Sequence, residues 1–221
     1  MEDFECGPIS CLTESGQYIL KDVVLKFQAP RLVVINGPSG CGKSTLLRAV
    51  AGLNRAKTAK RRLDSRLYSE KELPEWRAHV TLLLQDAPCL DGSLLDNISF
   101  AFGFKNGSDR TFSQDRALQI INKVRLDHIP LDAHVNRLSG GERHRLGIVR
   151  GLVWAPPVLM ADEPLSGLEP ELADSCFDIL KEYSRQQEAI VICVLHEERF
   201  ALRADEWLRL EHGTLHRVNT I

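Results

Sequence analysis

The chain has no long hydrophobic run. Its longest uninterrupted apolar stretches, such as residues 189–195, fall far short of the roughly 18 residues that a membrane-spanning helix requires. The first residues, Met1-Glu2-Asp3-Phe4, also lack the basic and apolar regions of a secretory signal peptide. We therefore expect a chain that carries no signal peptide and does not cross a membrane, which leaves open whether it works on one.

Paired cysteines and an excess of positive charge are also absent. Six cysteines occur without a C-x-x-C pair, and Cys6 and Cys11 have no second ligand pair that would complete a metal site. Scattered reduced thiols are typical of a cytosolic protein. The formal net charge is −2, so no global electrostatic argument favours a nucleic-acid partner. The local basic stretch at 55–66 favours a solvated loop or hairpin over a nucleic-acid patch.

What is present is an ordinary globular composition, with 43% hydrophobic and 26% charged residues. A length of 221 residues allows one large domain, or a domain with an inserted lobe. Apolar runs at 80–84, 158–161 and 189–195 predict buried strands, and residues 171–184 predict an amphipathic helix. Strands that alternate with helices indicate an α/β fold with a parallel sheet and helices on its faces.

Three further regions show other patterns of apolar and polar residues. The first thirty residues predict short antiparallel strands, with turns at Gly7-Pro8 and Ser15-Gly16. Residues 207–210 and 214–218 predict a closing hairpin that turns at Gly213. Between residues 91 and 150, periodic segments at 94–100, 116–124 and 142–152 predict a mostly helical insertion.

One stretch carries a specific chemistry. A β-branched apolar run at 32–35 leads into it, and apolar residues at helical spacing follow it. This strand, loop and helix context makes G-x-x-x-x-G-K-S/T a phosphate-binding loop rather than a glycine-rich turn that merely caps a helix. Backbone N–H groups and the helix dipole would hold phosphate oxygens, Lys43 would reach the β- and γ-phosphates, and Ser44 would ligate Mg²⁺. The loop consists of Gly37, Pro38, Ser39, Gly40, Cys41, Gly42, Lys43, Ser44 and Thr45.

Polar side chains follow three of the predicted buried strands. Gln85 follows the first, Asp162 and Glu163 follow the second, and His196 follows the third. Because ligands of open α/β sheets bind outside the carboxyl ends of the strands, these side chains can face the nucleotide held by the phosphate loop. A lone histidine after a strand is more often structural, and paired acids can be an ordinary strand exit. Next to a phosphate loop, their joint occurrence favours function.

A second glycine motif, Leu138-Ser139-Gly140-Gly141-Glu142, opens the predicted helix at 142–152. Ser139 with Glu142 three residues later is a common helix start and needs no further role. A serine and two glycines at a helix N-terminus also make an anion site. The phosphate loop already holds the nucleotide within one chain, so this second site makes sense if it closes over the nucleotide of a neighbouring subunit.

At this point the chain resembles the ATP-binding cassette (ABC) ATPases over nearly its whole length. The order and spacing of its motifs match those of the family. The matches are 37–45 with the Walker A loop, Gln85 with the Q-loop, 138–142 with the signature motif, 158–163 with Walker B, 165–169 with the D-loop and His196 with the switch histidine. The wording GPSGCGKSTLL and an early DNISF is similar to bacterial stand-alone transporter ATPases, including an iron-export type.

The resemblance implies a P-loop NTPase with a RecA-like parallel-sheet core, an N-terminal antiparallel β subdomain and an inserted helical subdomain at about 88–152, all in one domain of residues 1–221. It also implies the site. Glu163 would polarise the attacking water, His196 would contact the γ-phosphate, and Ser44, Gln85 and Asp162 would surround Mg²⁺. Members work as head-to-tail dimers, so Ser139, Gly140, Gly141 and Glu142 of one copy would complete the ATP site of the other.

Three positions depart from the family pattern. The signature motif ends in Glu142 where Gln is usual, and the D-loop carries Glu169 where Asp is usual, which affects contacts across the dimer. The aromatic residue that stacks on adenine in relatives should fall near Leu12 or Thr13, where none exists. Tyr18 is the nearest candidate, but it comes several residues later in the chain.

The sequence therefore predicts an ATP-hydrolysing subunit on the cytoplasmic face of a membrane, attached peripherally through a separate permease. The first alternative is a soluble ABC-type ATPase that is not coupled to transport and acts on nucleic acid or ribosomes. The lack of long coiled-coil insertions, of a second cassette and of net positive charge counts against it. A P-loop kinase or nucleotide switch is the second, and the signature motif and the Walker B glutamate count against it.

Overall fold

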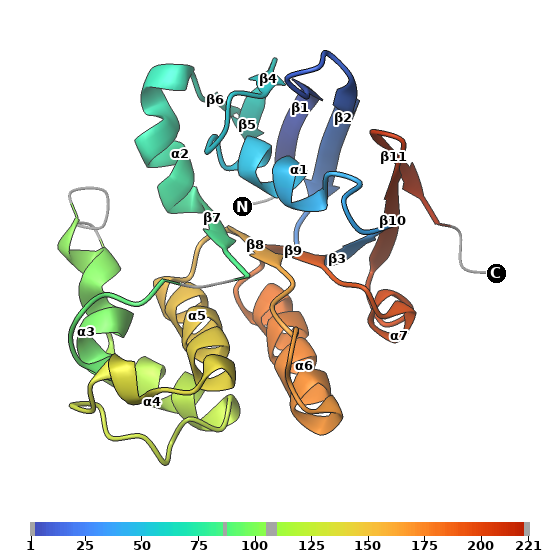
Figure 1. The fold of residues 1–221 in the computed structure, drawn as a ribbon. Coiled ribbons are helices and arrows are strands. Elements are labelled where there is room, and N and C mark those ends of the chain that lie inside the picture. The colour runs from blue at the N-terminus through green and yellow to red at the C-terminus, as the bar shows by residue number, and fades with distance from the viewer. Residues whose placement is uncertain (1–2, 86–87, 105–109, 219–221) are drawn as a thin grey trace.

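The computed structural model describes residues 3–85, 88–104 and 110–218, which form two sheets and a group of helices (Figure 1). The residues Met1 and Glu2 of the N-terminal stretch considered above lie outside these ranges. The larger sheet has six strands in the order β11-β10-β3-β9-β8-β7. They are β3 (Arg31–Asn36), β7 (Val80–Leu83), β8 (Val158–Asp162), β9 (Ile190–Val194), β10 (Glu206–Glu211) and β11 (Thr214–Arg217).

Five of these strands run parallel, and only β11 pairs antiparallel, with β10. Every residue of β8 and β9 is buried. Strands covered on both faces read as unbroken apolar runs, which is why the sequence predicted them correctly. Along β3, Leu32 and Val34 pack on one side of the sheet, while Val33 and Ile35 pack on the other.

The two core clusters that meet at β3 have different partners. One contains helix α1 (Lys43–Val50) and the N-terminal sheet, and the other contains α6 (Pro170–Gln186) and the helical lobe described below. Two short helices complete this part of the chain. They are α2 (Leu73–His79), preceded by a 3-10 turn at Glu70–Glu72, and α7 (Glu198–Ala201).

The N-terminal sheet is antiparallel, as predicted, but its strands are longer. Strands β1 (Asp3–Leu12) and β2 (Tyr18–Gln28) pair along most of their length and turn at residues 13–17. The prediction of a turn at Gly7-Pro8 was wrong, because these residues lie inside β1 at a shift of register between Cys6 and Ile9. Gly7 has a φ of 132° there, which is the backbone freedom that makes this dipeptide resemble a turn in sequence.

The basic stretch at 55–66 joins this sheet. It contributes β4 (Lys57–Thr58), β5 (Arg61–Leu63) and the start of β6 (Arg66–Leu67), so the predicted hairpin is present. Arg61 is only 5% exposed and bonds to Glu70 at 2.6 Å. Arg62 bonds to Glu5 at 3.0 Å. Much of the positive charge is therefore paired within the fold.

The remaining helices form a lobe below the larger sheet in Figure 1. They are α3 (Leu94–Ser99), α4 (Gln114–Lys123) and α5 (Gly140–Trp154), with 3-10 turns at Phe100–Gly103 and Val135–Arg137. The three predicted helical segments all overlap them. The predicted subdomain at 88–152 also includes residues 105–109, which lie outside the described residues. Helix α5 links the lobe to the sheet, because its C-terminal half packs against β7 and β8.

Candidate nucleotide-binding site

The phosphate loop connects β3 to α1 and is closely fitted to the β10 strand. Gly37 has a φ of 150°, and a Cβ at this position would lie 2.2 Å from the carbonyl oxygen of Leu210. Gly42 is the N-cap of α1 with a φ of 104°. The Lys43 ammonium, 6% exposed as a residue, donates to the carbonyl oxygens of Gly37 and Pro38 at 2.9 Å each. The lysine thus holds the loop in its curled shape.

The three polar strand ends meet at Glu163. Its carboxylate accepts a hydrogen bond from Gln85 Nε2 at 3.1 Å and another from His196 Nε2 at 2.7 Å. The backbone positions it, because Glu163 has a φ of 51° and its N–H donates to the Val194 carbonyl at 3.1 Å. A left-handed conformation outside glycine is uncommon and tends to occur at functional sites. The Glu163 carboxylate therefore joins Gln85, which is 78 positions earlier in the sequence, to His196, which is 33 positions later.

Asp162, directly before Glu163, is buried, and one of its carboxylate oxygens has no hydrogen-bond partner among the described residues. The residue is 3% exposed, and the unpartnered oxygen is Oδ1. A buried carboxylate oxygen is costly unless something binds it. The described residues contain no group of three or more His, Cys, Asp or Glu side chains that could hold a metal. A cation here would need other oxygen donors, such as the Ser44 hydroxyl and Gln85 amide predicted from sequence.

A pocket of about 670 Å³ adjoins the phosphate loop. Residues 38–41 of the loop form one wall, and the turns between β1 and β2 and between β10 and β11 form the others. Tyr18 lines this pocket and is paired across the hairpin with Leu12. Tyr18 comes several residues after Leu12 in the chain, but the turn at 13–17 brings it back beside Leu12. Its contact with the base stays a prediction.

The second glycine motif caps α5. Ser139 is the N-cap, and its Oγ accepts from Glu142 N at 3.3 Å. The Glu142 carboxylate accepts in return from Ser139 N and Ser139 Oγ, both at 2.7 Å, and from His128 Nε2 at 2.9 Å. These bonds lower the pKa of Glu142 from 4.5 to about 2, the Ser139 hydroxyl contributing most, then its N–H, then His128. A capped helix start is common to both interpretations of the motif, as a simple helix start and as an anion site.

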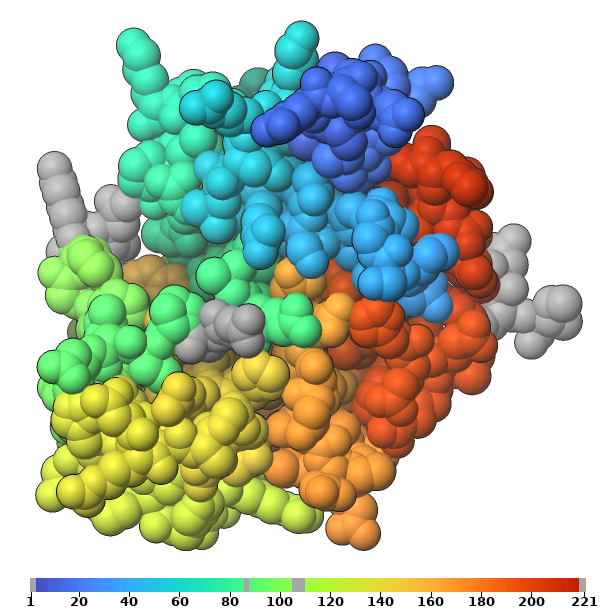
Figure 2. All heavy atoms as spheres, viewed as in Figure 1, coloured from blue at the N-terminus to red at the C-terminus, as the bar shows by residue number. Residues whose placement is uncertain are grey.

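The motif and the phosphate loop are exposed on one side of the molecule. Figure 2 shows the light-blue segment around residue 40 and the yellow segment around residue 140 on the same face, with the orange segment that follows β8 between them. The two segments are thus visible on one face, with other parts of the chain between them.

Comparison with known proteins agrees with this set of features. A family model described as ABC transporter matches residues 20–166. The lipoprotein-releasing system ATP-binding protein LolD of Treponema pallidum is 33% identical over 219 residues, covering 94% of this chain and 93% of that protein. The chain belongs to the ABC transporter family.

One further relative and one solved structure are also similar to this ABC protein. The phosphonates import ATP-binding protein PhnC of Hydrogenovibrio crunogenus is 30% identical over 207 residues, covering 90% of this chain and 76% of that protein. A dimeric, post-hydrolysis ATP-binding cassette bound to ADP and phosphate shares the fold. Its TM-score is 0.82 at 23% identity, with 99% of this chain and 100% of that chain covered. The chain is therefore an ATP-binding ABC ATPase with the predicted α/β P-loop fold. The narrower similarity to iron-export ATPases stays a prediction.

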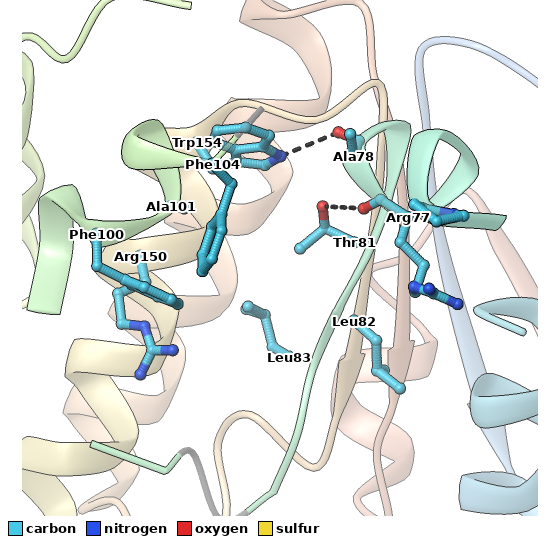
Figure 3. Close-up of a pocket in the computed structure, with 12 residues that line it drawn as sticks. Arg77, Ala78, Thr81, Leu82, Leu83, Phe100, Ala101, Phe104, Arg150 and Trp154 are labelled. Atoms are coloured by element: carbon cyan, nitrogen blue, oxygen red, sulfur yellow. Dashed lines mark hydrogen bonds between the residues drawn. The ribbon is translucent and has the colours of Figure 1, made fainter. Parts of the chain in front are cut away.

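This ABC ATPase has a second cleft that the sequence did not indicate. It has a volume of about 560 Å³ and lies between α2 and β7 on one side and the helical lobe on the other (Figure 3). Trp154 Nε1 donates to the Ala78 carbonyl at 3.0 Å and joins the two walls. The lining residues are Pro74, Arg77, Ala78, Thr81, Leu82, Leu83, Phe100, Ala101, Phe104, Arg150, Gly151 and Trp154. Most are apolar, and Arg77 and Arg150 add positive charge.

The cleft is tied to the polar site through β7. Leu82 and Leu83 line it, and Gln85 follows two residues later. On the opposite wall, the Arg150 guanidinium lies 5.3 Å from the Phe100 ring centroid and donates to the Pro88 carbonyl at 2.6 Å. Gln85 therefore follows a strand that lines the cleft, and Pro88 is held by a residue of the opposite wall. No helix among the described residues is long and apolar enough to cross a membrane.

Proposed function

We propose that this chain hydrolyses ATP to ADP and phosphate in order to drive a separate membrane permease, and that it does so as a head-to-tail homodimer. The observation that carries the proposal is the position of Glu163, held by Gln85 and His196 at the carboxyl edge of the sheet that also presents the phosphate loop. Phosphoryl transfer depends on positioning and on charge stabilisation more than on covalent chemistry, so no nucleophilic side chain is required.

Each side chain then has a distinct task. Glu163 accepts a hydrogen bond from the attacking water and orients it toward the γ-phosphate. His196, 51% exposed, exchanges its bond with Glu163 for one to a γ-phosphate oxygen. Lys43 transfers its donors from the carbonyls of the phosphate loop to the β- and γ-phosphates. The loop carbonyls and the phosphates compete for the same ammonium, so nucleotide binding remodels the loop.

Mg²⁺ fits the oxygen donors near the phosphate loop. The unpartnered Oδ1 of Asp162 and the Ser44 hydroxyl would hold it, with Gln85 as a further ligand. A cation that keeps several waters and completes its shell with phosphate oxygens suits such a sparse set. Bound there, it would neutralise the negative charge that develops on the phosphates.

The base of the nucleotide occupies the pocket that contains Tyr18. This pocket is continuous with residues 38–41 of the phosphate loop, and Tyr18 supplies an aromatic face that is 57% exposed and free to be covered. Stacking tolerates any base, because every base has a π face. The exclusive use of ATP over GTP is therefore not expected from this contact.

The dimer and the permease complete the proposal. Ser139, Gly140 and Gly141 of one copy would close over the nucleotide held by the Walker A loop of the other, which accords with the two motifs facing the same side. A short cytoplasmic segment of the permease would seat in the cleft between α2 and the lobe. Its apolar walls call for apolar side chains, and Arg77 and Arg150 call for an acidic group. The transported substrate would be chosen by the permease.

A glutamate-to-glutamine variant tests this function. Glu163→Gln keeps the shape of the side chain but removes the carboxylate that orients water, so ATP hydrolysis should fall by at least about a hundredfold. ATP binding should persist, and an ATP-trapped dimer should accumulate in size-exclusion chromatography. Unchanged hydrolysis would refute the role of Glu163.

Transport coupling needs a separate measurement, since an ABC ATPase that acts without a permease is the remaining alternative. The tagged chain would be recovered from detergent-solubilised membranes and its partners identified by mass spectrometry. Recovery of an integral membrane protein supports the permease. Recovery of water-soluble partners alone would favour the alternative.

A further inference from the structure

We propose that His128 is a positioning residue of the signature motif. It holds and partly neutralises the Glu142 carboxylate, so that the Ser139 hydroxyl can leave Glu142 and donate to a phosphate of the partner's nucleotide. This inference rests on the proposed dimeric ATPase and adds a residue that neither the motif nor the family match assigns.

The first step is a count of protons at Ser139. A hydroxyl has one proton to donate, and an ionised carboxylate can only accept. The Ser139 hydroxyl therefore donates its one hydrogen bond to Glu142 Oε2 at 2.7 Å, and its oxygen accepts a hydrogen bond from the Glu142 N–H. In this arrangement Ser139 has no proton for a phosphate. Engaging a nucleotide requires the hydroxyl to rotate away from Glu142.

The second step concerns what Glu142 keeps after that rotation. Its Oε2 still accepts the Ser139 N–H at 2.7 Å, and its Oε1 accepts from His128 at 2.9 Å. His128 therefore replaces part of the stabilisation that the hydroxyl withdraws. The Glu142 side chain is 20% exposed and the His128 ring 59%, so a compensating donor matters more to the carboxylate than to the histidine.

The third step is electrostatic. A glutamate in the motif places a negative charge at the surface that is meant to meet a triphosphate, and like charges disfavour that approach. A glutamine, the usual residue of the family, carries no such charge. The histidine N–H directed at the carboxylate reduces this repulsion. His128 lies on the segment after α4, outside the motif, and Ser139 and Glu142 already complete the helix cap between themselves.

A fold-only role for the pair is the competing explanation. A histidine that only supports the fold should lower the unfolding temperature when it is replaced by alanine. The proposed role predicts little change for His128→Ala, because a surface pair of this kind contributes little to folding stability. The two explanations also differ in their dependence on Glu142. A charge-compensating histidine matters only while residue 142 is a glutamate, whereas a packing role persists when Glu142 is replaced by glutamine.

A double-mutant cycle makes this distinction. The ATP concentration for half-maximal dimerisation would be measured by light scattering in the Glu163→Gln background, together with KM and kcat in the active chain. His128→Ala should raise the required ATP concentration and KM by roughly threefold to tenfold, the range of one charge-assisted hydrogen bond. In chains that also carry Glu142→Gln, the same change should shift both by less than about twofold.

His216→Ala is the matched control, because this exposed histidine lies on β11, across the molecule from the helical lobe (Figure 1). It should alter neither quantity. An equal effect of His128→Ala with either residue at 142, or no effect in either, would overturn the inference. If the unmodified chain neither hydrolyses ATP nor dimerises, the proposed function fails and takes the role of His128 with it.

Discussion

At the scale of single residues, the side chains that we propose bind nucleotide are bonded to groups of the chain itself. Lys43 is bound to the carbonyls of its own loop, His196 to Glu163, and Ser139 to Glu142. In the proposed function, each of these groups changes partner when a nucleotide binds. Among the described side chains of the predicted site residues, Oδ1 of Asp162 is the buried atom without a hydrogen-bond partner.

Tyr18 is the residue whose role in base binding is most directly testable. Tyr18→Ala should weaken ATP and GTP binding alike by roughly threefold to tenfold, which is near the lower end of measured base-stacking effects. Isothermal titration calorimetry with both nucleotides provides the comparison. Tyr18→Phe, which keeps the ring, is the control and should bind as the unmodified chain does. A loss confined to ATP would mean that Tyr18 reads the base by hydrogen bonding instead.

At the scale of structural elements, two glycines of one loop have different reasons to be glycine. A Cβ on Gly37 would meet the backbone oxygen of Leu210 at 2.2 Å, and backbone cannot move aside cheaply. Gly40 has a φ of 75° and nothing within 4 Å of a Cβ. Gly37→Ala should therefore lower the free energy of unfolding by about 3 kcal/mol or more, and Gly40→Ala by about 1 kcal/mol. Urea unfolding without nucleotide measures both, and equal losses would contradict the close approach of β10.

The start of α5 should give a pH-dependent contribution to stability. The pKa of Glu142 is lowered from 4.5 to about 2 in the folded chain. A lowered pKa means that its contribution is present above pH 4.5 and is lost as the pH falls toward 2. The free energy of unfolding of the unmodified chain should thus exceed that of Glu142→Ala by about 1 kcal/mol at pH 6 and converge with it near pH 2. Urea unfolding at both pH values tests this, and a difference that does not change with pH would contradict it.

Continuous burial made two of the predicted strands easy to recognise. Strands β8 and β9 are covered on both faces and appear as unbroken apolar runs. Helix α2 was missed because it is seven residues long and its two buried residues, Trp76 and Ala78, are two positions apart, which is not a helical spacing. The bulge at Gly7 was taken for a turn because both use the same backbone freedom.

The candidate site divides in the same way. Gln85, Glu163 and His196 could be grouped because parallel strands share a carboxyl edge, a rule that holds without coordinates. Tyr18 and His128 could not be grouped with the site in this way. The position of Tyr18 depends on the register of a hairpin, and His128 lies on an irregular segment. The cleft of Figure 3 also depends on the packing of α5 against α2, which no local pattern specifies.

At the scale of the whole molecule, the β7 segment connects two surfaces. Leu82 and Leu83 line the cleft of Figure 3, and Gln85 contacts Glu163. A partner that spreads or fills the cleft would shift this segment, and a nucleotide that withdraws Glu163 or attracts Mg²⁺ to Gln85 would shift it from the other end. Coupling between nucleotide and permease needs such an element shared by both sites.

A substitution of Phe104 tests the role of the cleft without altering the ATP site. Phe104 is 60% exposed and lines the cleft, so Phe104→Asp should change the free energy of unfolding by less than about 0.5 kcal/mol. Its negative charge in an apolar groove should nevertheless abolish recovery of an integral membrane protein from detergent-solubilised membranes. Basal hydrolysis of ATP by the purified chain should stay unchanged, because Phe104 lies outside the nucleotide pocket.

Leu67→Asp is the matched control for Phe104→Asp. Leu67 is also 60% exposed, but it lies on β6 of the N-terminal sheet rather than in the cleft. It should recover the membrane partner as the unmodified chain does. Loss of the partner in both variants would mean that a new surface charge, not the cleft, disrupts the complex. Full recovery with Phe104→Asp would place the permease contact elsewhere on the molecule and would remove the β7 segment as the physical link between nucleotide and transport.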